Sequence, residues 1–123
     1  MKMMIGELRI MKMTNGNFVE AYSNQIAFQE KVTGLTCPSD YPDQLEYQMC
    51  AMVEELGEVL KADKRWKTHR NTAYIHDEKV DEIADVFIVA MNVAIYSGMT
   101  AEELMESVNR KIAENFERLN KVQ

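Results

Sequence analysis

Apolar side chains recur at steps of three and four residues in four successive stretches of this chain, and this period predicts an all-α fold. With 5 glycines and 2 prolines in 123 residues, the chain has too few turn residues for an all-β protein. The predicted helices run from about Asn17 to Val32, from about Asp43 to Lys67, from near Asp77 to just before Gly98, and from Thr100 onward. Four helices with short connections predict an antiparallel four-helix bundle.

Several local signals mark the ends of these helices. Gly34 fits a stop after the first helix, which Thr14 or Asn15 would cap, and Pro42 fits the first turn of the second. Thr100 and Glu103 have the spacing of a capping box at the start of the last helix. We therefore expect one helical domain over residues 14–123 and a loose N-terminal arm over residues 1–13.

Charge and cysteine content restrict the classes of partner. The chain has 14 basic and 20 acidic residues, a net charge of −6, which argues against broad contact with nucleic acid. The longest apolar run, Ile83 to Tyr96, contains Asp85 and Asn92 and is too short and polar to span a bilayer. Cys37 and Cys50 have no metal-site or disulfide spacing. We expect a cytoplasmic protein with no nucleic-acid or membrane partner.

One acid stands out in the third predicted helix. Asp85 is the only charge between Ile83 and Met91, and we expect it to be shielded from solvent, where a carboxylate needs a partner. Glu82 lies three residues earlier and Asn92 seven residues later on the same helical face. This helix is apolar nearly all round, so it is predicted to be central and most buried.

The second predicted helix carries a matching pair of acids, Glu55 and Glu58. Antiparallel packing of the two helices would bring these acids toward Glu82 and Asp85. Two carboxylates 4 Å apart repel by roughly 4 kcal/mol at an effective dielectric of 20. A divalent cation relieves that repulsion, and an all-oxygen ligand set favours Mg²⁺, with Mn²⁺ as a substitute.

These acids have two other interpretations, as solvent-facing side chains and as ligands of a di-iron site. Glutamates on helices usually face solvent, and this suits Glu54 and Glu102 better than Asp85. A di-iron carboxylate bundle requires Glu-x-x-His motifs. Neither His69 nor His76 lies three residues after a Glu, so the di-iron class is not favoured.

The acids also resemble the signature of a known superfamily. Glu55-Leu-Gly-Glu58 followed by Glu82-Ile-Ala-Asp85 is similar to the E-x-x-E…E-x-x-D motif of the all-α nucleoside triphosphate pyrophosphohydrolases, which include MazG-like proteins and all-α dUTPases and dCTPases. Glu54 gives the fuller E-E-x-x-E form. The resemblance extends from about Leu45 to Leu119, and its end resembles the nucleotide-contacting segment of that superfamily.

The resemblance implies a reaction and a set of residue roles. A (deoxy)nucleoside triphosphate would be hydrolysed between its α and β phosphates to a monophosphate and pyrophosphate, in nucleotide pool house-cleaning. The implied metal ligands are Glu55, Glu58, Glu82 and Asp85, and the implied catalytic residues are Glu55, as general base, and Lys111. The implied substrate-binding residues are Trp66, Asn92, Lys111, Asn115 and Arg118, with Lys111 and Arg118 stabilising phosphate charge.

Some alternatives stay open at this point. Trp66 would stack on the base or seal the end of the bundle, and Asn92 would contact substrate or hold a polar contact between helices. Small relatives usually form homodimers or homotetramers in which a neighbour completes the active site. The alternative functions are a non-catalytic oligomeric bundle that binds a nucleotide or partner, and a metal-binding bundle without nucleotide.

Overall fold

The computed structural model describes residues 17–34, 42–67 and 74–122 of the chain. The predicted N-terminal arm, the candidate caps Thr14 and Asn15, and the residues Cys37 and His69 lie outside these ranges. No single described helix is long and apolar enough to cross a membrane; one bent pair, α4 (His76–Tyr96) with α5 (Ala101–Val122), passes by length and composition alone.

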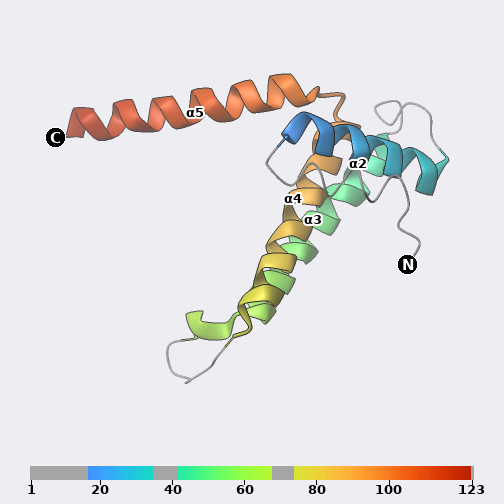
Figure 1. The fold of residues 1–123 in the computed structure, drawn as a ribbon, viewed down its shortest axis with the longest axis horizontal. Coiled ribbons are helices and arrows are strands. Elements are labelled where there is room, and N and C mark those ends of the chain that lie inside the picture. Colours follow the sequence, from blue (N-terminus) through green and yellow to red (C-terminus); the bar gives the residue numbers. More distant parts are fainter. Residues whose placement is uncertain (1–16, 35–41, 68–73, 123) are drawn as a thin grey trace.

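The described residues are almost entirely helical and contain no strand, which confirms the all-α fold (Figure 1). The elements are α2 (Phe18–Thr33), α3 (Pro42–Ala62), the 3₁₀ turn η2 (Lys64–Trp66), α4 (His76–Tyr96) and α5 (Ala101–Val122). Their positions follow the predicted helices closely because each contains one strong apolar period.

Most helix boundaries have the predicted cause. Gly34 ends α2 with a φ of 75°, a left-handed conformation that glycine adopts without strain. At the start of α5, the Thr100 backbone N–H donates to Glu103 Oε1 (2.7 Å), and the Glu103 N–H donates to Thr100 Oγ1 (3.1 Å). The capping box is therefore confirmed. The cap of α2 differs from the prediction: it is Asn17, and not Thr14 or Asn15, whose side chain accepts from the Glu20 N–H.

The end of α3 differs from the prediction. The helix stops at Ala62, not at Lys67. The side chain of the next residue, Asp63, accepts a hydrogen bond from the Arg65 backbone N–H (3.1 Å). An aspartate that bonds to its own neighbouring backbone competes with continued α-helix. The chain turns here into η2 and leaves the axis of α3.

Helices α3 and α4 form a long antiparallel hairpin, and α2 lies across the end where α4 finishes (Figure 1). Because α4 contacts both α2 and α3, its predicted central position is confirmed. Helix α5 leaves α4 at a bend of 117° and extends away from the hairpin (Figure 1).

The apolar core lies where α2, the end of α4 and the start of α5 meet. Its buried members are Tyr22, Ala94, Ile95 and Ala101. The Tyr22 hydroxyl donates to the Met99 carbonyl (2.7 Å), which ties α2 to the α4–α5 connection. The core thus lies at one end of the molecule.

The prediction that α4 is the most buried helix holds for its C-terminal part only. Its earlier part exposes Phe87 to 66%, and Asp85 is exposed, contrary to the prediction. The apolar side chains of α5 from Val108 onward are likewise exposed, with Phe116 63% exposed. The physical reason is the direction of α5, which in a closed bundle would run back along the hairpin.

Candidate metal centre

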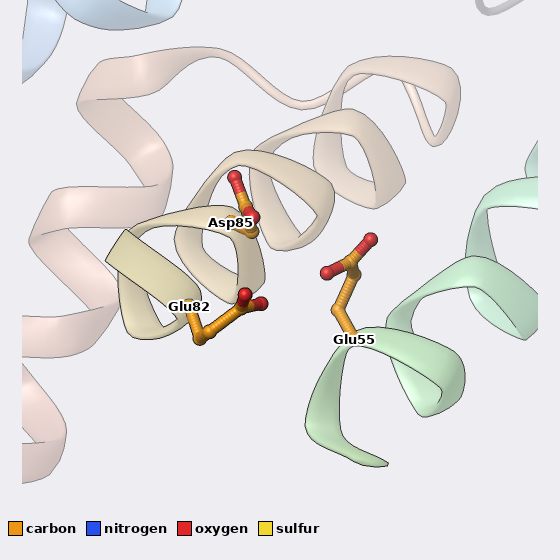
Figure 2. Close-up of side chains that lie close together, drawn as sticks. All are labelled: Glu55, Glu82 and Asp85. Atoms are coloured by element: carbon orange, nitrogen blue, oxygen red, sulfur yellow. The ribbon is translucent and has the colours of Figure 1, made fainter. Parts of the chain in front are cut away.

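Three acids from two helices meet in the middle of the hairpin. Glu55 on α3 faces Glu82 and Asp85 on α4 (Figure 2). One carboxylate oxygen from each of the three lies within 4.8 Å of the others. Glu82 and Asp85 share a face because they are three residues apart on one helix, and the antiparallel partner supplies Glu55.

The electrostatic environment of this acidic cluster favours a cation. Partial burial, followed by the charges of Asp85 and Glu82, raises the pKa of Glu55 above its ordinary value. The same carboxylate would be stabilised by a positive ion between the three side chains. Because every donor atom is a carboxylate oxygen, the ligand set fits a hard cation such as Mg²⁺ or Mn²⁺.

Glu58, the fourth predicted ligand, lies beside this cluster but not in it. Its carboxylate is 3.5 Å from the Lys61 ammonium, one turn further along α3. It lines an open cleft of about 370 Å³ with Lys61, Ala62, Glu78, Asp81 and Glu82. Since Glu82 belongs to both the cleft and the cluster, Glu58 is a neighbour of the site, and its role as a ligand stays a prediction.

A second charged group, which the sequence analysis missed, lies at the end of the hairpin where α3 stops and α4 begins. Asp63 is buried and accepts from Arg65 Nε (2.9 Å), Arg65 Nη2 (2.7 Å) and Lys79 Nζ (2.7 Å). The Arg65 and Lys79 hydrogen bonds hold the pKa of Asp63 well below its usual range. The signal in the sequence was an acid among basic residues directly after the α3 apolar stripe.

Asn92 takes part in a buried contact between helices. Its Oδ1 accepts from Gln25 Nε2 on α2 (2.9 Å), and its Nδ2 donates to Gln48 Oε1 on α3 (3.0 Å). These contacts fit the second of the two interpretations of Asn92, a polar contact between helices. Its role in binding substrate stays a prediction, and its two glutamine partners were not singled out from sequence.

Trp66 does not seal the end of the bundle, because its side chain is 57% exposed. Its indole N–H donates to the Leu60 carbonyl (3.3 Å), and the Lys67 ammonium lies 5.2 Å from its ring centroid. The ring is accessible to a planar ligand, so stacking on the base, the other interpretation of Trp66, stays a prediction.

The three predicted phosphate and nucleotide contacts on α5 do not meet the acidic cluster of their own chain. Lys111, Asn115 and Arg118 are exposed, and the Arg118 guanidinium donates to Asn115 Oδ1. Figure 1 shows the C-terminal half of α5 extending away from α3 and α4. Their roles stay predictions, and a single chain does not place them at the acids.

Comparison with known families identifies the domain. The profile of the PRA-PH family, described as phosphoribosyl-ATP pyrophosphohydrolase, matches residues 28–112. This match covers more than half of the chain, so the chain belongs to that family, a member of the all-α, MazG-like pyrophosphohydrolase superfamily. No curated protein and no solved structure matches the chain significantly. The matched range contains Glu55, Glu82 and Asp85, and it ends before Asn115 and Arg118.

Proposed function

We propose that this member of the family is a divalent-metal-dependent nucleotide pyrophosphohydrolase. It would hydrolyse a nucleotide triphosphate between the α and β phosphates and release pyrophosphate. The observation that carries the proposal is the meeting of Glu55, Glu82 and Asp85 from two helices, with ligand oxygens within 4.8 Å, inside the matched domain.

The acidic cluster would hold the metal, with Glu58 joining if its side chain leaves Lys61. When bound, Mg²⁺ would neutralise phosphate charge and activate a water molecule for attack on the α-phosphorus. The chain itself supplies two fixed ligands on one face of α4 and a third from α3. Glu55 is also our candidate for the general base.

The family name points to phosphoribosyl-ATP as one substrate to test, and the sequence resemblance points to ordinary or modified (deoxy)nucleoside triphosphates. Both share the bond that would be cleaved. Exposed Trp66 is proposed to stack on the base, and Asn92 to contact the sugar or base through its network. A cytoplasmic location and a role in nucleotide pool house-cleaning are further parts of the proposal.

We also propose that the active form is a homodimer or homotetramer in which a neighbour completes the site. The C-terminal half of α5, the helix that contains Lys111 and Arg118, extends away from α3 and α4 (Figure 1). It also exposes an apolar stripe that a second copy would cover: Val108, Ile112, Phe116 and Leu119. At the bend between α4 and α5, an apolar cavity of about 540 Å³ is lined in part by Val108, the first residue of this stripe.

Light scattering tests the assembly. Phe116→Glu is expected to lower the measured mass toward that of one chain, because it places a charge in the stripe. Lys121→Glu, an acidic substitution at another exposed position of α5, is the control and should leave the mass unchanged. A wild-type mass of one chain at micromolar concentration would contradict this part of the proposal.

The main test is pyrophosphate release from a panel of phosphoribosyl-ATP and canonical and modified nucleoside triphosphates, with Mg²⁺ and with EDTA. We expect release from one or a few of them, and only with metal. Glu82→Gln should abolish turnover while circular dichroism stays helical, because the cluster loses a charged ligand. Glu102→Gln, an exposed acid on α5, is the matched control.

Other results select the alternatives. If the folded protein releases no pyrophosphate from any substrate but is stabilised by triphosphates, the non-catalytic binding bundle is correct. If it binds metal and no triphosphate stabilises it, the metal-binding bundle is correct. Full activity in Glu82→Gln would overturn the assignment of the metal centre.

A further inference from the structure

Three polar contacts between α3 and α4 succeed one another along the hairpin. The first is the Gln48–Asn92 amide pair, and the second is the acidic cluster. The third is the ion pair of Asp63 with Lys79. Gln48 lies seven residues before Glu55, so the amide pair and the cluster are about 10 Å apart along the helix axis.

The two outer contacts differ from the cluster between them. Gln48, Asn92 and Asp63 are all buried, whereas the acids are half-buried or exposed. The outer pairs attract, through an amide hydrogen bond of 3.0 Å and an ion pair of 2.7 Å. The acids carry like charges, and like charges repel at this separation.

No apolar side chain described on α3 is fully buried, although Met52 and Val59 are half-buried. Among the described side chains of α3, Gln48 is the only buried one. Val53, Leu56 and Leu60 are each at least half exposed. Such partial apolar packing leaves room for polar contacts to help keep Glu55 opposite Glu82 and Asp85 when no cation is present.

The Asp63 group joins the two helices at the end of the hairpin where the chain passes from α3 to α4. Arg65 binds Asp63 with two guanidinium nitrogens and fixes its carboxylate from the α3 side. The same carboxylate accepts from Lys79, which lies three residues before Glu82 on α4. The Arg65 guanidinium also lies 3.5 Å from the Tyr74 ring centroid, which orients it from the segment leading into α4.

We propose that the Asp63–Lys79 ion pair and the Gln48–Asn92 amide pair are positioning contacts that hold Glu55 against Glu82 and Asp85 before a cation binds. Asp63, Lys79 and Gln48 touch no reacting group in this scheme and act through the acids. The inference rests on the proposed metal centre for its biological purpose, but its physical content concerns the metal-free protein. It therefore has a test that needs neither metal nor nucleotide.

The test is a double-mutant cycle on stability in EDTA, with Glu55→Gln and Lys79→Met. Glu55→Gln removes repulsion and should raise the folding equilibrium constant of the wild type. If Lys79 holds the acids together, Lys79→Met lets them separate. The increase in the folding equilibrium constant caused by Glu55→Gln should then be about threefold smaller than in the wild type. Independent sites are expected to deviate from additivity by no more than roughly twofold.

The sign of the coupling separates positioning from direct attraction. Glu55 and Lys79 share no hydrogen bond or ion pair in the described part of the chain. A direct attraction between their charges would make Glu55→Gln more stabilising, not less, in the Lys79→Met background. Equal effects in both backgrounds, or the opposite sign, would overturn the proposal.

Two variants guard against a trivial loss of structure. Lys79→Arg keeps the charge and should restore the wild-type effect of Glu55→Gln. Lys64→Met removes a neighbouring exposed lysine and should leave that effect unchanged. If Lys79→Met does not fold, Gln48→Met tests the amide pair in the same cycle, with the same expected sign.

A second readout links the contacts to metal. Mn²⁺ binding, followed by its electron paramagnetic resonance signal, should weaken severalfold in Lys79→Met and not in Lys79→Arg or Lys64→Met. Unchanged Mn²⁺ affinity in folded Lys79→Met would contradict positioning. If the wild type itself binds no Mn²⁺, the proposed function fails, while the cycle in EDTA still decides the positioning contacts.

Discussion

The two ends of this molecule are held together by different forces. At the α2–α4–α5 junction, Tyr22, Ala94, Ile95 and Ala101 form an apolar core. Along the α3–α4 hairpin, the buried contacts are polar and the apolar side chains are mostly exposed. The first end buries apolar side chains, and the second brings charged side chains of two helices together near the surface.

The largest difference should appear when one apolar side chain is shortened at each end. Ile95→Ala in the core is expected to lower the free energy of unfolding by about 3 kcal/mol, because it leaves a cavity. Leu60→Ala on the hairpin, where the side chain is 52% exposed, should cost well under half as much. Equal losses, measured by urea unfolding, would show that the hairpin has a covered apolar face.

Acid should weaken the hairpin before the core. The folded protein holds the pKa of Asp63 well below its ordinary value of 3.8, so this group favours folding above that value. The stabilisation is lost as the pH falls below about 3.8 toward the lower folded pKa. In Asp63→Asn, the free energy of unfolding should depend less on pH in this acidic range than in the wild type. An unchanged dependence would mean that another carboxylate dominates it.

High pH should lower the stability of the core through ionisation of Tyr22. Burial, and then the charge of Glu103, raises the pKa of Tyr22 from 10.0 to about 12. A raised pKa favours folding at lower pH, so this contribution is complete below pH 10 and is lost between pH 10 and about 12. Tyr22→Phe removes that dependence and the hydrogen bond to Met99, at a cost of about 1 kcal/mol near neutral pH. Stability curves of the two proteins that run parallel above pH 10 would contradict the burial of this hydroxyl.

A similarly small effect is expected at the capping box that begins α5. Thr100→Ala removes the acceptor for the Glu103 N–H and should cost about 1 kcal/mol. Because α5 leaves the core here, Thr100→Ala should lower the free energy of unfolding, measured with urea. Mn²⁺ binding at the acidic cluster should stay unchanged. A fall in Mn²⁺ affinity would show that the two ends are coupled.

The sequence predicted the fold well because helix period and helix ends are local properties. Pro42, Gly34 and the Thr100–Glu103 pair each fixed a boundary from a few neighbouring residues. Three of the four acids predicted to lie together, Glu55, Glu82 and Asp85, do so because an antiparallel pair of helices leaves few choices of register.

The contacts that the sequence did not reveal join residues far apart in the chain. Asp63 and Lys79 are 16 residues apart, Gln48 and Asn92 are 44 apart, and Gln25 and Asn92 are 67 apart. No local pattern distinguishes such glutamines from solvated ones. The direction of α5 was equally hidden, since the same apolar stripe would suit a closed bundle and a helix that projects from the core.

Helix α5 also has a consequence for the exchange of backbone hydrogens. The first turns of α5 pack on the core, but a helical segment beyond such contacts is only marginally stable in water, because its end frays and its hydrogen bonds open often. The last turns of α5, beyond the core, should then exchange their amide hydrogens for deuterium quickly in any chain that is alone. Slow amide exchange in these turns would indicate that a neighbouring chain covers them, and the exchange rate would report how often that cover opens.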